Sequence, residues 1–140
     1  MSKKPETPLL TVDAVIQYDR NSIILIKRKN PPFKGEYALP GGFVDIGETV
    51  EEACVREALE ETSLKVKIIK LIGVFSDPKR DPRGHTVSLA YLCKPASKKS
   101  KPKAQDDAEY LEIVPMSTLL SLNLAFDHMD IIKASGILES

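Results

Sequence analysis

The sequence has no net charge, no long apolar run and no excess of basic residues. Its 140 residues include twenty Lys and Arg and twenty Asp and Glu, which cancel. Because the overall charge attracts neither nucleic acid nor an anionic membrane surface, any phosphate binding must be local. No apolar stretch is long enough to span a bilayer. We therefore expect no nucleic-acid partner and no membrane partner.

Cysteine is scarce as well. Cys54 and Cys93 are the only two, and their spacing matches neither a zinc site nor a redox motif. We expect both to be small, buried, apolar side chains. The N-terminal sequence MSKKPETP is polar and lacks the apolar segment of a signal peptide. Together these features predict a cytoplasmic location.

The length and the apolar content of 42% suit one globular domain with one core. We expect a flexible N-terminal leader over residues 1–8 and a single domain over residues 9–140. No internal repeat and no linker divides the chain.

Runs rich in β-branched residues alternate with helical patterns. A hairpin is expected where residues 9–18 and 22–29 flank the turn Asp19-Arg20-Asn21. Further strands are expected over residues 66–76, 85–94 and 110–114. Helices are expected from Thr49 onward, over residues 115–120 and over residues 126–138. This order predicts the α/β class, with a mixed sheet covered on both faces.

The most informative stretch is PGGFVDIGETVEEACVREALEETSL, residues 40–64. On a helix, Glu57, Glu60 and Glu61 are neighbours on one face, because residues three and four apart lie side by side. Clustered carboxylates repel one another, and a hard divalent cation with oxygen ligands would neutralise them. The alternative is an ordinary solvated face, which is the usual role of glutamates on a helix.

The spacing of this stretch favours the cation. Six residues fit the pattern G-x5-E-x7-R-E-U-x-E-E-x-G-U, in which U is a bulky apolar residue: Gly42, Glu48, Arg56, Glu57, Glu60 and Glu61. The stretch resembles the Nudix box of the Nudix hydrolases. Two positions depart from it, because Ser63 replaces a glycine and Ala58 is small for an apolar position. Since glycine normally supplies the left-handed cap of a helix, we expect Ser63 to strain that cap without touching the chemistry.

The resemblance implies a fold, a cofactor and a set of site residues. It implies the Nudix α/β/α sandwich, with a box over residues 42–64, and metal-dependent hydrolysis of a nucleoside diphosphate derivative. The implied ligands of Mg²⁺ or Mn²⁺ are Glu57, Glu60, Glu61 and the carbonyl of Gly41. Arg56 and Glu48 match a pair that holds the metal-binding helix to its loop. The family also uses an acidic residue outside the box, for which Asp107 is our first choice ahead of Asp106 and Glu109.

A second stretch of the sequence narrows the range of expected substrates. Residues 76–92, SDPKRDPRGHTVSLAYL, and Phe126-Asp127-His128 resemble the ADP-ribose pyrophosphatase branch, which converts ADP-ribose and water to AMP and ribose 5-phosphate. Arginine suits phosphate because its guanidinium can donate two parallel hydrogen bonds. The candidate phosphate ligands are Arg28, Arg80 and Arg83. Adenine could stack on Phe126, with Phe33 and Tyr37 as alternatives, and Asp77 or Asp81 could accept from ribose hydroxyls. We expect a structural hydrogen bond for His85 and a surface or capping position for His128.

Two other functions remain open at this point. The chain could be a MutT-like enzyme that hydrolyses oxidised nucleoside triphosphates, which would release pyrophosphate. It could also be a non-catalytic sensor of ADP-ribose, as in relatives fused to a DNA-binding winged helix. Because the box glutamates are intact and no residues follow Ser140 to form such a domain, we expect an enzyme. A homodimer is possible, since members of this branch are often dimers.

Overall fold

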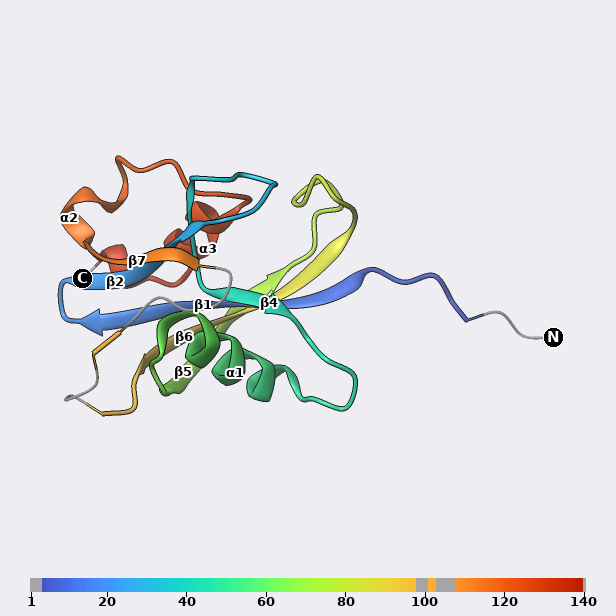
Figure 1. Ribbon diagram of the computed structural model, residues 1–140, viewed down its shortest axis with the longest axis horizontal. Helices are drawn as coiled ribbons and strands as arrows, with labels where there is room; N and C mark the ends of the chain where they lie inside the picture. Colours follow the sequence, from blue (N-terminus) through green and yellow to red (C-terminus); the bar gives the residue numbers. More distant parts are fainter. Residues whose placement is uncertain (1–3, 98–100, 103–107, 140) are drawn as a thin grey trace.

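The computed structural model of the chain describes residues 4–97, 101–102 and 108–139. Figure 1 shows a sheet with α1 (Val50–Thr62) on one side and α3 (His128–Ala134) on the other. The short α2 (Met116–Leu119) follows the last strand, and a 3₁₀ turn, η1 (Ile137–Glu139), follows α3. The predicted α/β class and the covering of the sheet on both faces are confirmed.

The sheet is mixed. Its strands are β1 (Leu9–Asp19), β2 (Ser22–Arg28), β3 (Tyr37–Ala38), β4 (Gly41–Phe43), β5 (Val66–Phe75), β6 (Thr86–Pro95) and β7 (Ala108–Pro115). Their order is β3-β2-β1-β6-β5, with β4 paired to β1 and β7 paired to β2. β1 and β6 are parallel, and the other pairs are antiparallel. The expected hairpin joins β1 to β2, and the side chain of Asp19 accepts from the Asn21 N–H at 2.8 Å in the turn.

Alternation along β1 divides its side chains between two cores. Val12, Ala14 and Ile16 belong to the core under α1, which also contains both cysteines. Val15 packs in the second core with Ile131 and Ile132 of α3. Since successive side chains of a strand point to opposite faces, Asp13 lies on the α3 face. Both cysteines are buried as expected, with their sulfur atoms 3.8 Å apart.

α1 begins where its sequence predicts. Thr49 caps it, because its hydroxyl accepts from the Glu52 N–H at 3.1 Å while the Glu52 carboxylate accepts from the Thr49 N–H at 3.0 Å. This reciprocal capping box satisfies two backbone donors at the helix start. The helix end is also as expected, because Ser63 takes the left-handed conformation at φ 62°.

Replacing Ser63 with Gly should stabilise the protein. The left-handed conformation costs a residue with a side chain about 1–2 kcal/mol, and glycine avoids this cost. Glycine also loses more conformational freedom on folding, which offsets part of the gain. We expect Ser63→Gly to raise the free energy of unfolding by about 0.5–1 kcal/mol, measured by urea titration. Ser63→Ala is the matched control and should give no gain. An equal gain in stability in both variants would contradict backbone strain at Ser63 as its source.

The structure adds a strand to the expected elements and shortens one helix. Residues 41–43 form β4, which the sequence analysis did not predict, because this short segment pairs with residues 11–13 of β1. The expected helix over residues 126–138 is shorter, because α3 covers only His128–Ala134. Phe126 precedes it at φ 54°, and Gly136 ends it at φ 81°. Neither conformation continues a right-handed helix.

No helix within the described ranges is both long enough and apolar enough to cross a membrane.

Candidate active site

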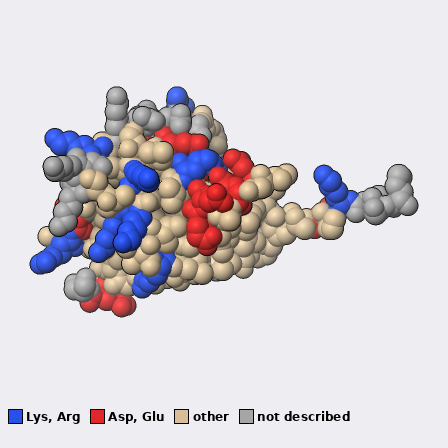
Figure 2. Space-filling model, turned by 90° about the horizontal axis from the view of Figure 1, so that it is seen from below, with Lys and Arg blue, Asp and Glu red and all other residues tan. Residues whose placement is uncertain are grey.

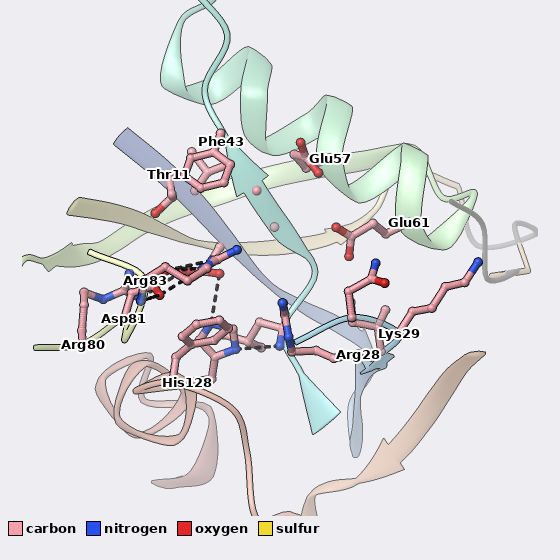
Figure 3. Close-up of a pocket in the computed structure, with 18 of the residues that line it drawn as sticks. Thr11, Arg28, Lys29, Phe43, Glu57, Glu61, Arg80, Asp81, Arg83 and His128 are labelled. Atoms are coloured by element: carbon pink, nitrogen blue, oxygen red, sulfur yellow. Dashed lines mark hydrogen bonds and ion pairs between the residues drawn. The ribbon is translucent and has the colours of Figure 1, made fainter. Parts of the chain in front are cut away.

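A cavity of about 340 Å³ opens between α1, β4, the segment after β2 and the start of α3 (Figure 3). Glu57 and Glu61 point into it from α1, while Arg28 and His128 approach from the opposite side. Arg80, Asp81 and Arg83, from the loop between β5 and β6, lie at one end. The cavity therefore brings together the box and the loop that resembles the ADP-ribose branch.

Arg56 connects α1 to the loop that precedes it. Its guanidinium donates to both carboxylate oxygens of Glu48, at 2.6 and 3.0 Å, and to the Phe43 carbonyl at 3.0 Å. It also donates to Glu57 at 2.8 Å and to Glu60 at 3.1 Å. The expected Arg56–Glu48 pair is present, and the same guanidinium orients a carboxylate that lines the cavity.

Glu48 gives this linkage a pH dependence. The hydrogen bonds from Arg56 and from the Asp45 N–H lower the pKa of Glu48 from 4.5 to about 2. The unfolded chain therefore binds more protons than the folded chain between these two values. The stabilisation is complete above pH 4.5 and is lost as the pH falls toward 2.

We expect Glu48→Gln to lower the stability at neutral pH and to differ less from the wild type below pH 4.5. Chemical unfolding of both proteins across this range measures the difference. A difference that stays constant as the pH falls would contradict the ion pair as its source.

The three box glutamates do not share one environment. Glu57 and Glu61 line the cavity, and Glu61 is only 6% exposed. Glu60 is not among the lining residues, and its side chain is 45% exposed beside Arg56. Burial raises the pKa of Glu57, and the hydrogen bond and charge of Arg56 offset only part of this effect. Figure 2, seen from the α1 side, shows acidic side chains gathered in one area of the surface.

The glycine pair lets the backbone approach these carboxylates closely. A Cβ on Gly42 would lie 2.6 Å from the carboxylate of Glu57, and a Cβ on Gly41 would lie 2.2 Å from the carbonyl of Val12. Both distances are shorter than real contacts allow. At Gly41 the obstacle is backbone, so only glycine fits there, whereas a side chain at Gly42 would displace the carboxylate of Glu57. The backbone of β4 thereby forms the cavity wall beside Glu57.

The donor set suits a hard cation. Two largely buried carboxylates one helical turn apart, with a third beside them, offer the oxygen ligands that Mg²⁺ and Mn²⁺ prefer. A cation would also favour the charged form of Glu57, which burial alone disfavours. The described residues contain no ready-made group of three His, Cys, Asp or Glu side chains in a metal-binding arrangement. Asp106 and Asp107 lie outside the described residues, and the side chain of Glu109 is also not described.

Arginines and aromatic rings gather across the cavity. The Arg28 guanidinium lies 5.0 Å from the centre of the Phe126 ring, and the Arg83 guanidinium lies 5.7 Å from the centres of both Phe126 and Phe43. Phe33 meets Phe126 edge to face, with ring centres 4.9 Å apart. Arg83 also donates to the buried carboxylate of Asp81 at 2.8 Å.

Arg80 is engaged differently from the other two arginines. Its side chain is 5% exposed, and it donates to both oxygens of Asp127, at 2.9 and 2.7 Å. It also donates to the Thr86 hydroxyl at 2.8 Å. The two hydrogen bonds from Arg80 to Asp127 connect the loop between β5 and β6 to the start of α3. Contact with a substrate would therefore require Arg80 to release Asp127.

The expected surface or capping position of His128 is wrong. His128 is 4% exposed, lines the cavity and contacts Asp13, which the sequence analysis did not single out. A single carboxylate within the apolar strand sequence LTVDAVIQY was the available signal. A buried charge requires partners, so its position in that strand indicated a polar group on the opposing helix. The nitrogen Nε2 of His85 lies 3.0 Å from the Ser76 carbonyl, in the structural hydrogen bond that was expected.

The sequence of residues 7–134 matches the model of the NUDIX domain, so the chain belongs to the NUDIX domain family. Within that family it is 52% identical over 126 residues to the ADP-ribose pyrophosphatase of Methanocaldococcus jannaschii, covering 90% of this chain and 72% of that protein. It is 37% identical to an ADPR-responsive transcriptional repressor of Acinetobacter baylyi, of which it spans 52%.

Solved structures share this fold. The NUDIX domain of Shewanella oneidensis NrtR, in complex with ADP ribose, superimposes with a TM-score of 0.84 at 29% identity, over 96% of this chain and 90% of that one. A MutT/nudix family protein of Enterococcus faecalis gives 0.83 at 32% identity, and this chain covers 63% of its length.

Proposed function

We propose that this chain hydrolyses the diphosphate of ADP-ribose to AMP and ribose 5-phosphate, with the help of Mg²⁺ or Mn²⁺. The observation that carries the proposal is the meeting, in one cavity, of two largely buried box carboxylates and two arginines that lie beside aromatic rings. Similarity to an ADP-ribose pyrophosphatase over 90% of the chain supports this substrate.

The carboxylate side of the cavity serves the reacting phosphates. Glu57 and Glu61, with Glu60 and the Gly41 carbonyl, are the proposed ligands of the cation. When bound, the cation supplies charge neutralisation on the diphosphate and a more acidic water. Arg56 and Glu48 hold these carboxylates in place. Asp107 is the proposed base that takes the proton from the attacking water.

The arginines and aromatic rings of the cavity contact the phosphates and bind the rest of the substrate. Arg28 and Arg83 donate hydrogen bonds to phosphate oxygens, because a guanidinium matches the geometry of a phosphate. Phe126 offers a ring face on which adenine stacks. Arg80 belongs to the same group of proposed substrate contacts and reaches the substrate only by exchanging Asp127 for phosphate. Positioning and electrostatics suffice for this reaction, so no nucleophilic side chain is required.

Product identification tests the proposal directly. The purified chain is incubated with ADP-ribose, with an oxidised nucleoside triphosphate and with other sugar nucleotides, each in the presence of Mg²⁺ or Mn²⁺. We expect fastest turnover on ADP-ribose, giving AMP and ribose 5-phosphate in equal amounts. Preferred release of pyrophosphate from the triphosphate would assign the MutT-like activity instead. Tight binding of ADP-ribose without turnover would assign the sensor function.

A further inference from the structure

The segment Phe126-Asp127-His128 contacts three different parts of the cavity. Phe126 meets Arg28, Asp127 holds Arg80, and His128 reaches both β1 and the segment before β4. Phe126 adopts a left-handed conformation at φ 54°, which is costly for an aromatic residue and persists only where the surroundings hold it. Proposed substrate binding accounts for the ring of Phe126 and leaves His128 unexplained.

His128 is hydrogen-bonded through both ring nitrogens. Its Nδ1 accepts from the Leu39 N–H at 3.0 Å, and its Nε2 lies 3.2 Å from Oδ1 of Asp13. Because Nδ1 accepts, it carries no proton, so the proton resides on Nε2 and is donated to Asp13. Asp13 is held in turn by the Ser88 hydroxyl at 2.5 Å, and Arg80 lies 3.5 Å away.

In the sequence, Leu39 directly precedes the segment Pro40 to Gly42, whose backbone forms the cavity wall beside Glu57. The Pro40 carbonyl accepts from the Ala14 N–H at 2.8 Å, and Gly41 and Gly42 then pair with Asp13 and Val12 of β1. A Cβ on Gly41 would lie 2.8 Å from the Asp13 carboxylate, so the Asp13 side chain lies close against Gly41. A shift of Leu39 would therefore move the backbone that faces Glu57.

We propose that His128, oriented by Asp13, is a positioning residue that holds residues 39–42 at the distance from Glu57 that the reaction requires. The inference rests on the proposed hydrolase function and adds a role for α3 to it. His128 acts through the backbone of Leu39 and takes no part in the chemistry. Misplacement of a cavity wall by about 1 Å can cost on the order of 100-fold in rate, so a single hydrogen bond here can control turnover.

Two substitutions separate the two hydrogen bonds of His128. In asparagine, the side-chain oxygen stands where Nδ1 stands in histidine, so His128→Asn keeps an acceptor for the Leu39 N–H. In glutamine, the amide reaches the position of Nε2, so His128→Gln keeps a donor for Asp13 and loses that acceptor. Ser135→Ala is the control, because it removes a buried hydroxyl bonded to the Ile132 carbonyl and the Ile137 N–H, away from the cavity.

Steady-state kinetics with ADP-ribose, together with thermal unfolding, decide the question. We expect kcat of His128→Gln to fall at least about tenfold below that of His128→Asn, with KM changed less than kcat. Ser135→Ala should lose stability and keep the wild-type kcat. Equal kcat values for the two His128 variants, or a loss that follows the unfolding temperature alone, would overturn the proposal.

A measurement on the wild-type protein works without any substrate. Nitrogen-15 NMR of His128 should show Nδ1 without a proton and Nε2 with one, and the Leu39 amide should exchange slowly with solvent. A proton on Nδ1, or fast exchange at Leu39, would overturn the proposal even if His128→Gln fails to fold. If the wild type does not hydrolyse ADP-ribose, the proposed function fails. Faster exchange at Leu39 and Gly42 in His128→Gln than in His128→Asn would still support the structural role of His128.

Discussion

Replacement of Glu61 by glutamine is expected to lower kcat for ADP-ribose hydrolysis by about 100- to 1,000-fold. Glu61 is nearly buried and points into the cavity one turn from Glu57, so a neutral amide removes charge where the cation and the diphosphate meet. Glutamine keeps almost the same volume, so the core under α1 should remain packed. The loss should appear in kcat and kcat/KM together, because the interaction is made with the transition state.

Glu51→Gln provides the matched control on the same helix. Glu51 does not line the cavity; it accepts from the Tyr91 hydroxyl at 3.0 Å, and a glutamine oxygen can accept the same bond. This variant should keep wild-type kinetics. Both variants should show the circular dichroism of the folded protein. Wild-type turnover by Glu61→Gln would show that the reaction does not require the carboxylate pair of Glu57 and Glu61.

Removal of divalent cations should abolish turnover altogether. With EDTA in excess, we expect no measurable AMP, and activity should return on addition of Mg²⁺ or Mn²⁺ and remain absent with Na⁺ or K⁺. The reason lies in the cavity, where the carboxylates of Glu57 and Glu61 would repel a diphosphate in the absence of a counter-charge. Arg28 faces them from the other side and Arg83 lies at one end, and these two arginines cannot neutralise both the carboxylates and the diphosphate.

Stability gives an independent measure of the same binding event. A ligand that binds only the folded protein raises its unfolding free energy by RT ln(1 + [L]/Kd), so Mn²⁺ should raise the unfolding temperature of the wild type. Glu61→Gln should reduce this increase, and Glu51→Gln should retain it. Full activity in EDTA, or an equal shift in all three proteins, would contradict cation binding at the box.

The sequence analysis succeeded where the determinants are local. Residue spacing within one helix predicts which box residues are neighbours, and the capping box of Thr49 and Glu52 marks the helix start. The turn after β1 is likewise determined by Asp19 and Asn21, which contact each other directly. These features depend on residues within one helix or one turn, so they can be predicted from a pattern.

The polar network that connects α3 to the cavity could not be predicted in this way. His128 contacts Leu39 across 89 positions of the sequence, and Arg80 contacts Asp127 across 47. These contacts depend on the parallel register of β1 with β6 and on the docking of α3, neither of which is visible in a local pattern. From the sequence alone, a loop arginine such as Arg80 is therefore predicted to be a phosphate ligand. Only the fold shows that Asp127 and Thr86 surround it.

The separation of Glu60 from Glu57 and Glu61 has the same origin. Helical spacing places the three glutamates on one face, but the packing of the helix determines which of them reach the cavity. The Arg56 guanidinium lies beside Glu48 and Glu60, and the Glu60 side chain stays 45% exposed there. Of the three glutamates, only Glu57 and Glu61 line the cavity.

The most direct test of this account is a crystal structure of the protein with Mn²⁺ and an ADP-ribose analogue whose bridging diphosphate oxygen is replaced by a methylene group. Anomalous scattering locates the manganese without ambiguity. We predict a manganese peak within ligand distance of the Glu57 and Glu61 carboxylates, with the diphosphate between that ion and Arg28 or Arg83. Manganese bound elsewhere, with Glu57 and Glu61 contacting neither ion nor phosphate, would contradict the proposed site.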